Sequence, residues 1–255
     1  MGAPEFVQSS VRQGRALDRT EHRPWPAPGR RWRLGQTWQE MLFAHWELPA
    51  ETLLPHLPDG LELDTFDARA WLGITPFRLT DLRARGLLPA PWLSSFLELN
   101  VRTYVTDGGQ RPGIWFFSLD ASSSAAVEAA RFAYRLPYFL ARMSAAWSDG
   151  WLSYECARSG EPGRVFSGRY RPSGDMFEPE PGTLEHFLTE RYCLYTTDRR
   201  GALWRAEIHH EPWSLQPAEA EIGLTTISLV ELADEPALLH YSKRQDVVIW
   251  PLERV

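Results

Sequence analysis

Short runs of β-branched and aromatic residues, separated by Gly, Pro and Asp, recur from Gln36 to the C-terminus and limit the possible folds more than any other feature. Such runs are typical of antiparallel strands. The clearest pair, 96–105 and 113–121, is joined by TDGGQRP, a turn sequence that predicts a hairpin. Further strands are expected at 36–48, 61–66, 68–77, 151–158, 164–172, 191–196, 202–210 and 246–252. The regular strand–helix alternation of a doubly wound fold is absent, so a mainly β (α+β) domain is predicted.

A few helical insertions interrupt the strands. Prolines close a short helix over 49–58, and Ser122 to Ser124 can cap a helix that runs to the break at Arg135-Leu136-Pro137. Another helix is expected at 183–192, and 82–95 is expected to be an irregular loop. The run 138–147 fits either a short helix or a strand. These helices are too few to form a layer of their own.

Length and composition indicate one domain over residues 31–255, preceded by a flexible leader over residues 1–30 that is polar, Arg-rich and then Pro-rich. The net charge of −6 argues against a nucleic-acid partner. No signal peptide and no apolar stretch of membrane-spanning length is visible, so a cytoplasmic protein without a membrane partner is expected. A homo-oligomer is left open.

Several common catalytic and cofactor motifs are missing from the sequence. It contains no G-x-S-x-G elbow, and no G-x-G-x-x-G or Walker loop, so neither a serine hydrolase nor a nucleotide cofactor is expected. Cys156 and Cys193 match no zinc spacing and are interpreted as free buried thiols, although a disulfide between them stays open. We therefore expect no cofactor.

Strand 96–105 carries the most informative polar pattern. Because side chains alternate between faces, Glu98, Asn100 and Arg102 share one face, between Phe96 and Tyr104. A carboxylate, a carboxamide and a guanidinium in a row can line a cavity and hold a small anion or carbonyl compound. Periodicity alone favours a simpler interpretation, in which this face meets solvent.

Histidines offer weaker candidates. Glu207, His209 and Glu211 would share a strand face and could contribute metal ligands, but their spacing matches no known metal motif, and we expect no metal. His45 and His240 could act as general acids or bases. Each is more simply interpreted as a packed histidine in aromatic surroundings.

Lys243 is the only lysine, against twenty-six arginines. Schiff-base chemistry needs an amine that can lose its proton, and a guanidinium cannot replace it. Apart from the N-terminal amine, any imine mechanism therefore depends on Lys243. The S-K-R-Q-D run around it favours a solvated turn over a catalytic pocket.

Longer motifs resemble the YqjF-like family, a domain of unknown function. They extend from about Trp32 to Val255 and include LFAHW, GLELDTFDARAWLGITPFR, ELNVRTYV, LPYFLARM, FLTERYCLYT, EIHHEPW and DVVIWPLERV. The family is similar to the acetoacetate-decarboxylase-like superfamily. The resemblance implies an antiparallel β-barrel or cone of strands around a central pocket, with a few peripheral helices.

The resemblance also bears on the site residues. In the decarboxylases the nucleophilic lysine follows a proline, whereas Tyr138 and Phe139 follow Pro137 here. This difference implies that the imine-forming amine is missing at that position. Glu98 resembles the carboxylate that the decarboxylases place on an inner strand. The polar face of 96–105 is therefore expected to line the pocket.

Three hypotheses follow for the function. The first is a protein that binds a small carboxylate or carbonyl compound through Glu98, Asn100 and Arg102, with Arg131, Tyr138 and His240 as weaker candidates. The second is a lyase or decarboxylase-like enzyme that uses Glu98 with a histidine, or Lys243 as an imine-forming amine. The third is a purely structural or interaction protein, which predicts a cone filled by its own side chains.

Overall fold

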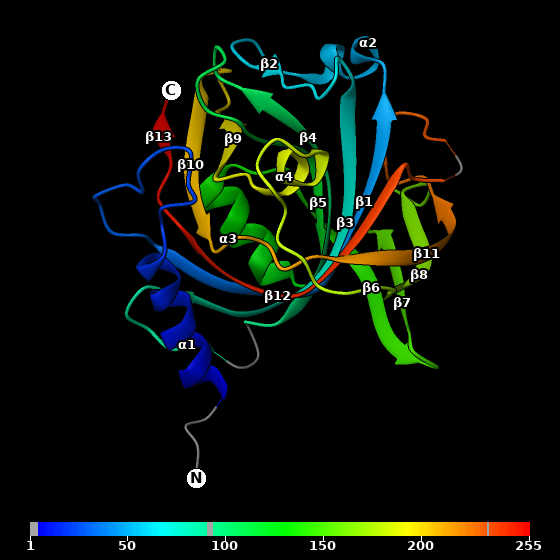
Figure 1. Cartoon of the computed structure of the whole chain (residues 1–255), viewed down its shortest axis with the longest axis horizontal. Helices are drawn as coiled ribbons and strands as arrows, with labels where there is room; N and C mark the ends of the chain where they lie inside the picture. Colours follow the sequence, from blue (N-terminus) through cyan, green and yellow to red (C-terminus); the bar gives the residue numbers. More distant parts are fainter. Residues whose placement is uncertain (1–4, 91–93, 234) are drawn as a thin grey trace.

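The computed structural model describes residues 5–90, 94–233 and 235–255, and strands dominate it (Figure 1). The strands are β1 (Leu34–Leu48), β2 (Glu62–Leu63), β3 (Ala70–Ala84), β4 (Phe96–Thr106), β5 (Gly113–Ala121), β6 (Tyr138–Ser148), β7 (Trp151–Arg158), β8 (Val165–Pro172), β9 (Cys193–Thr197), β10 (Leu203–His210), β11 (Gln216–Thr225), β12 (Leu238–Ile249) and β13 (Glu253–Arg254). The helices are α1 (Glu5–Arg15), α2 (Ala50–Leu53), α3 (Ser124–Tyr134) and α4 (Leu184–Thr189), with 3-10 turns η1 (Ala16–Asp18) and η2 (Leu54–His56).

Strand pairing closes two rings that share a wall. The seven-strand ring consists of β1, β3, β4, β5, β9, β10 and β12. The nine-strand ring continues from β5 through β6, β7, β8 and β11 back to β12, and returns through β1, β3 and β4. Most pairs are antiparallel, whereas β5 pairs in parallel with β6 and β9. The predicted mainly β barrel with a few helices is confirmed.

The shared wall is buried on both faces. Along β4 every residue is buried, which is unusual for an antiparallel strand with one solvated face. Phe96 belongs to the apolar cluster inside the seven-strand ring, and Leu97, Leu99 and Val101 belong to the cluster inside the nine-strand ring. Alternation along the strand therefore distributes side chains between two interiors rather than between core and solvent.

Local sequence explains the ends of α3, which contacts β5 and β6. The Ser123 side chain accepts a hydrogen bond from the Ala126 amide at the N-terminus, as the serine run predicts. Arg135 adopts a left-handed conformation (φ 55°) at the C-terminus, and Pro137 prevents continuation. The helix therefore ends at Tyr134, and Tyr138, the residue after Pro137, is the first residue of β6.

Four sequence-based expectations need correction or completion. Residues 138–148 are a strand, which settles the choice between helix and strand. Residues 216–225 form β11, a strand that was not predicted. The S-K-R-Q-D run lies within β12 rather than in a turn, although Lys243 is exposed. The loop expected at 82–95 begins only after Ala84, and its residues 91–93 lie outside the described part.

The N-terminal segment is folded against the rings where it is described. Gln13 is fully buried, and its amide donates hydrogen bonds to Thr37 Oγ1 and to the Asp81 carbonyl. The Arg23 guanidinium is also buried, with Nη2 2.8 Å from Glu207 Oε2. Gln13 and Arg23 therefore pack against the rings, although they lie in the segment that composition predicts to be a flexible leader.

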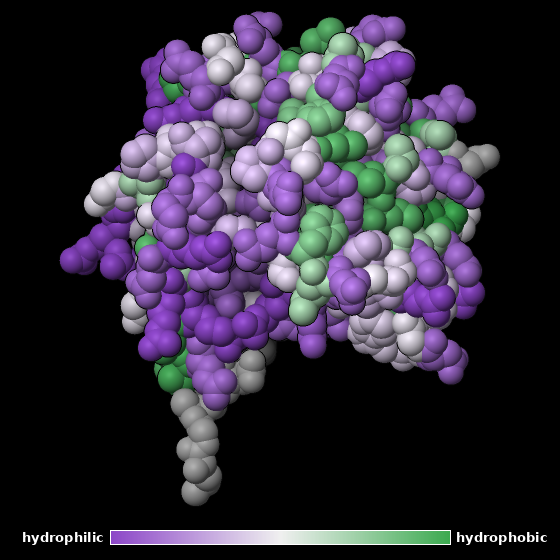
Figure 2. Space-filling view, in the orientation of Figure 1, coloured by the Kyte–Doolittle hydropathy of each residue, from purple (hydrophilic) through white to green (hydrophobic). Residues whose placement is uncertain are grey.

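The surface seen in Figure 2 is largely polar, with apolar residues gathered on the right over the region of β8, β11 and β12. Charged pairs cover part of this outer sheet, because Arg169 and Arg171 of β8 form ion pairs with Glu221 and Glu219 of β11. Within the described residues, no helix is both long enough and apolar enough to cross a membrane.

Candidate functional site

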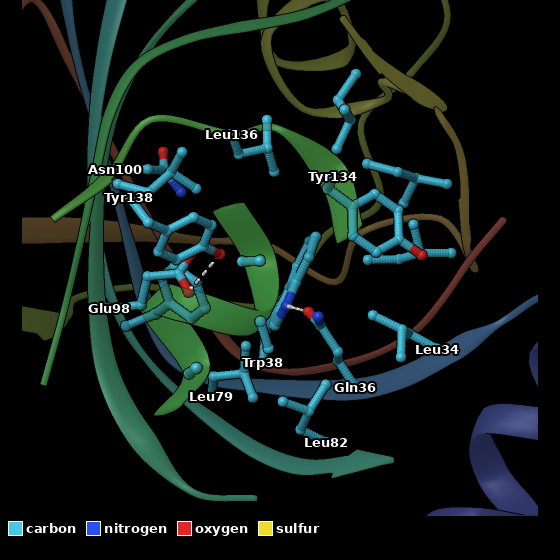
Figure 3. Close-up of a pocket in the computed structure, with 18 of the residues that line it drawn as sticks. Leu34, Gln36, Trp38, Leu79, Leu82, Glu98, Asn100, Tyr134, Leu136 and Tyr138 are labelled. Carbon is cyan, nitrogen blue, oxygen red and sulfur yellow. Dashed lines mark hydrogen bonds between the residues drawn. The ribbon is translucent and has the colours of Figure 1, made fainter. Parts of the chain in front are cut away.

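The seven-strand ring contains a cavity of about 480 Å³. All seven strands of the ring contribute to its wall, and α3 adds Ala126, Ala130 and Tyr134. Figure 3 shows Glu98, Asn100 and Tyr138 on one side of this space, with Leu34, Gln36 and Leu82 toward another. The volume lies in the range of about 300–1,000 Å³ that is usual for small-molecule pockets. A purely structural protein would instead have a filled cone.

The polar row on β4 faces this cavity. Glu98, Asn100 and Arg102 are 3%, 4% and 5% exposed, and all three line the cavity. The simpler interpretation, in which this face meets solvent, is therefore wrong. A few polar side chains in a largely apolar wall are typical of a site that orients a bound molecule.

Glu98 and Tyr138 form a buried pair. The Tyr138 hydroxyl donates a hydrogen bond to Glu98 Oε2 at 2.9 Å (Figure 3). Burial raises the pKa of Glu98 to about 8; the negative charge of Asp120 adds to this, and the Tyr138 hydrogen bond opposes it. Glu98 is therefore largely protonated at neutral pH and can donate as well as accept a hydrogen bond.

The fold positions Tyr138 through its main chain. Leu119 of β5 lies opposite Tyr138 in a parallel register, and the Leu119 amide donates to the Pro137 carbonyl. Arg131 Nε donates to the Tyr138 carbonyl at 2.8 Å. Arg131, predicted as a ligand-binding residue, does not line the cavity and is half-exposed. Its contact supports Tyr138 instead.

Asn100 is oriented by its neighbour across the strand pair. Thr75 of β3 lies directly opposite, and its hydroxyl donates to Asn100 Oδ1. Both residues are buried. Because the carbonyl oxygen is engaged, the amide nitrogen of Asn100 is the group that remains to donate to a bound molecule.

Arg102 is a buried cation without a counter-ion among the described residues. No described carboxylate forms an ion pair with it, and its Nε has no described hydrogen-bond partner. The guanidinium carbon lies 5.3 Å from the Phe43 ring centroid and 5.9 Å from that of Tyr104. Cation–π contacts compensate only part of the cost of burying a charge.

His45 lies beside Arg102 and was a weak candidate in the sequence. His45 Nε2 is 2.6 Å from the Tyr104 hydroxyl, and the imidazole is fully buried. Burial lowers the pKa of His45 well below its usual value, and the Arg102 charge lowers it further. A Cβ at Gly73 would come within 3.2 Å of the His45 ring, so glycine leaves room for this packing. His45 is therefore neutral and adds no charge.

Sequence analysis missed several residues of the cavity wall. Trp38 donates from Nε1 to Gln36 Oε1 at 2.8 Å, and both line the cavity (Figure 3). The Tyr134 hydroxyl is buried without a described hydrogen-bond partner, and burial raises its pKa to about 12. His210 also lines the cavity, with its pKa lowered to about 4 by burial. The only sequence signal for these residues is the alternation along β1, which places Gln36 and Trp38 on the same face of the strand.

His240 and Lys243 lie outside this cavity. His240 is buried on β12, with its ring 5.6 Å from that of Phe177. Lys243 lies in a separate surface groove that Trp147, Tyr241 and Arg244 also line. The fold therefore does not bring these two catalytic candidates together with Glu98.

The run from Glu207 to Glu211 takes part in ion pairing at the N-terminal segment. Glu207 Oε2 accepts from Arg23 at 2.8 Å, and Oε1 accepts from Arg111 at 2.6 Å. His209 Nε2 lies 2.7 Å from the Ala16 carbonyl. Among the residues that the structure describes, no group of three or more His, Cys, Asp or Glu could hold a metal ion. The pattern thus anchors residues 16–23.

The two cysteines are free and buried, as expected. Cys156 on β7 belongs to the apolar cluster of the nine-strand ring, whereas Cys193 on β9 packs with Leu61, Val105 and Tyr195. They lie in separate clusters, and burial raises the pKa of both thiols. Neither lines the cavity.

Comparison with known proteins agrees with the fold. Residues 35–246 match the model of DUF2071, described as an uncharacterized conserved protein. The chain is 45% identical over 226 residues to the uncharacterized protein YqjF of Bacillus subtilis (strain 168), covering 88% of this chain and 93% of that protein.

Solved structures of similar fold include an acetoacetate decarboxylase from Legionella pneumophila, with 14% identity, a TM-score of 0.57 and coverage of 100% of this chain and 97% of that chain. The enduracididine biosynthesis enzyme MppR, complexed with pyruvate, has 12% identity, a TM-score of 0.61 and coverage of 92% and 93%. Likeness at such identities concerns the fold alone.

Proposed function

The chain belongs to the DUF2071 family of uncharacterized conserved proteins, and we propose that its cavity binds a small organic molecule with a carboxylate or carbonyl group. The fold is similar to that of an acetoacetate decarboxylase and to that of the enduracididine biosynthesis enzyme MppR, which was solved complexed with pyruvate. In this proposal Arg102 binds the carboxylate, and Asn100, Glu98 and Tyr138 provide hydrogen bonds.

The observation that carries this proposal is the buried Arg102 guanidinium. It lines the cavity, is 5% exposed and has no described acidic partner. A buried charge without a partner is costly, and a bound anion would remove much of that cost. The neutral form of Glu98 fits the same proposal, because an ionised Glu98 would repel an anion in the same cavity.

Calorimetric titration of benzoate and pyruvate, each beside its neutral amide, tests the proposal. We expect the acids to bind more tightly than the amides, and Arg102→Met to weaken acid binding by about tenfold to a hundredfold, the worth of a charge-assisted hydrogen bond. Arg102→Lys keeps the charge but loses the planar fork, so it should cause a smaller loss. The exposed Arg142→Met is the matched control. Equal binding of acid and amide, or unchanged affinity in Arg102→Met, would contradict the role.

A second candidate function is acid–base catalysis on a carbonyl compound. It rests on Glu98, whose pKa of about 8 and contact with Tyr138 suit proton transfer near neutral pH. His210 lines the same cavity, whereas His240 does not, so His210 is the candidate histidine partner. Exchange of the protons α to the carbonyl of added keto acids, followed by NMR in D₂O, would detect this activity. Loss of exchange in Glu98→Gln is the expected result, and exchange that persists would refute it.

The imine form of the enzyme hypothesis can be tested separately. Lys243 does not line the cavity, so borohydride reduction with β-keto acids should leave no adduct on it. Mass spectrometry gives a clear answer because the chain has one lysine. An adduct on Lys243 that requires the keto acid would revive the imine mechanism.

A further inference from the structure

The order of residues along β3 and β4 gives the cavity a direction. Phe96 lies opposite Leu79, Glu98 opposite Phe77, Asn100 opposite Thr75, and Arg102 opposite Gly73. Leu34 and Ala84, which pair at the other end of the wall, line the cavity next to Leu87 and Leu88, which are 65% and 59% exposed. The solvent-facing mouth therefore lies at the Leu34 end, and Arg102 lies at the far end of the polar row.

The far end is closed and carries one excess positive charge among the described residues. Beyond Arg102, the Tyr104 ring is fully buried with Trp71 and Leu188. Arg191 also lines the cavity, with its guanidinium carbon 5.0 Å from the Tyr104 ring centroid, and its Nη1 is 2.5 Å from Asp64 Oδ2. Asp64 thus neutralises Arg191, and the Arg102 guanidinium has no described carboxylate partner and can bind an anionic ligand.

The length of the polar row excludes very small acids from using all of it. Glu98 and Arg102 are four residues apart, which corresponds to about 13 Å along a strand. A three-carbon acid held by Arg102 is too short to extend along this distance. A longer molecule can place its carboxylate at Arg102 and pass Glu98 on the way to the mouth.

Most of the wall between the two ends is apolar. Leu79, Phe116, Leu119 and Leu136 surround the passage, and Trp38 and Leu82 continue it toward the mouth (Figure 3). Such a wall offers an alkyl or aryl chain apolar contacts along its whole length. Leu87 and Leu88 extend this apolar surface into solvent.

We propose that the ligand is an amphipathic carboxylic acid, with its carboxylate at Arg102 and an extended apolar tail directed to the mouth at Leu87 and Leu88. This inference rests on the proposed function and adds to it the ligand class and the binding orientation. The opposite orientation would use the cations at the mouth. Arg83 is already engaged there, since its Nε donates to Gln13 and its Nη2 to the Ser10 carbonyl, whereas Arg33 is exposed to water.

Calorimetric titration of butanoate, octanoate and dodecanoate, with octanol as the uncharged probe, tests the ligand class. Affinity should rise about threefold to fourfold for each methylene that the wall buries, and octanol should bind more weakly than octanoate. Affinities that depend on Arg102 but not on chain length would overturn this inference and leave the proposed function intact. Absence of binding by every acid would overturn both.

Two arginine variants test the orientation. Arg102→Met should reduce octanoate affinity by about tenfold or more, and Arg33→Met by less than about twofold. The reverse pattern would show a carboxylate at the mouth and would overturn the proposed orientation. If Arg102→Met fails to fold, Arg33→Met remains informative alone, because a loss of tenfold or more there overturns the orientation and an unchanged affinity supports it.

Substitutions at the mouth test the path of the tail. Leu87→Asp and Leu88→Asp replace exposed side chains, so folding should be unaffected. They should weaken dodecanoate binding severalfold and leave butanoate binding unchanged. Leu54→Asp, at a leucine that is 50% exposed and outside the cavity, is the matched control. Equal losses for both acids, or none for dodecanoate, would place the tail elsewhere and contradict the proposal.

Discussion

The two rings are built on the same wall and have different interiors. In the nine-strand ring, Tyr154, Phe166 and Tyr170 pack against leucines from the shared strands. In the seven-strand ring, the other faces of those strands surround a cavity of about 480 Å³ with Glu98, Asn100 and Arg102 in its wall. The difference arises from alternate residues of the same strands, so it does not reflect a difference in backbone.

The contrast extends to the polar groups of the two interiors. The Tyr154 hydroxyl donates to the Glu98 carbonyl at 2.8 Å, and the Tyr170 hydroxyl donates to the Glu40 carbonyl at 2.7 Å. Both are satisfied within the protein. Arg102 and the Tyr134 hydroxyl have buried atoms without a described partner. Buried polar groups without a partner are rare in folded proteins, so their presence in the hollow ring supports the proposed binding role.

The largest expected effect comes from removing a side chain from the filled ring. Leu99→Ala deletes a fully buried leucine in a packed interior and should lower the free energy of unfolding by about 2–5 kcal/mol. Leu79→Ala makes the same chemical change in the cavity wall, where it only enlarges an existing space, and should cost about 2 kcal/mol. Urea denaturation measures both. Equal losses would mean that the rings are packed alike.

The next effect concerns the pH dependence of the hollow ring. Glu98 has a folded-state pKa of about 8 against an ordinary value of 4.5, so the folded state binds the extra proton between these two pH values. Its contribution to stability is fully present below pH 4.5 and is lost as the pH rises through about 8, by up to about 1.4 kcal/mol per pH unit. Buried histidines such as His45 and His210 contribute with the opposite sign only below about pH 6.5, so unfolding at pH 7 and pH 8 should show a decline that Glu98→Gln reduces. The exposed Glu51→Gln should keep the wild-type decline.

A third effect has the opposite sign. Arg102→Met replaces a buried charge without a described acidic partner by an apolar side chain of similar length, and should raise the free energy of unfolding by about 1–3 kcal/mol while weakening acid binding. Loss of the contacts with Phe43 and Tyr104 offsets part of this gain. Thermal unfolding without ligand measures it. A destabilised variant would show that Arg102 supports the fold, and would remove the contrast between the rings.

The smallest effect is expected at Tyr138. Tyr138→Phe removes the hydrogen bond to Glu98 and should cost about 0.5–1.5 kcal/mol. Because that bond lowers the pKa of Glu98, its loss should move the pH-dependent decline to higher pH. Urea denaturation across the same pH range checks both effects. An unchanged pH profile would mean that the two groups are not coupled.

Local signals explain which elements were predictable. The hairpin of β4 and β5 has strict alternation and an Asp-Gly-Gly turn, and α3 has its serine cap, so both follow from sequence. In contrast, β6 is a strand because it pairs in parallel with β5. Helix α3 separates the two strands in the sequence, so the periodicity of residues 138–148 alone does not reveal this pairing. β11 includes Pro217 and alternating glutamates, which do not suggest a strand. It pairs with β8, where Arg169 binds Glu221 although the two residues are 52 positions apart in the sequence. Its strand character depends on that pairing.

The site divides in the same way. Glu98, Asn100 and Arg102 were predictable as a row because alternation places them on one face. Their burial was not, because an antiparallel strand usually has a solvated face. Only the closure of two rings on one wall buries both faces of β4, and closure depends on contacts between distant strands. Closure of the ring also places Arg191 and His210 in the cavity wall, and no local sequence pattern identifies them as site residues.

The shared wall also limits how this protein can diverge. Inserting or deleting one residue within 96–106 would turn every following side chain to the opposite face, which would send a guanidinium into packed hydrocarbon and leucines into the cavity. A length change in this segment would therefore have to be absorbed by a β-bulge, as in the neighbouring pairings of β1 with β3 and β4 with β5. Substitution of the residues of β4 that face the cavity, such as Glu98, Asn100 and Arg102, would change the ligand preference without disturbing the packing of the other ring.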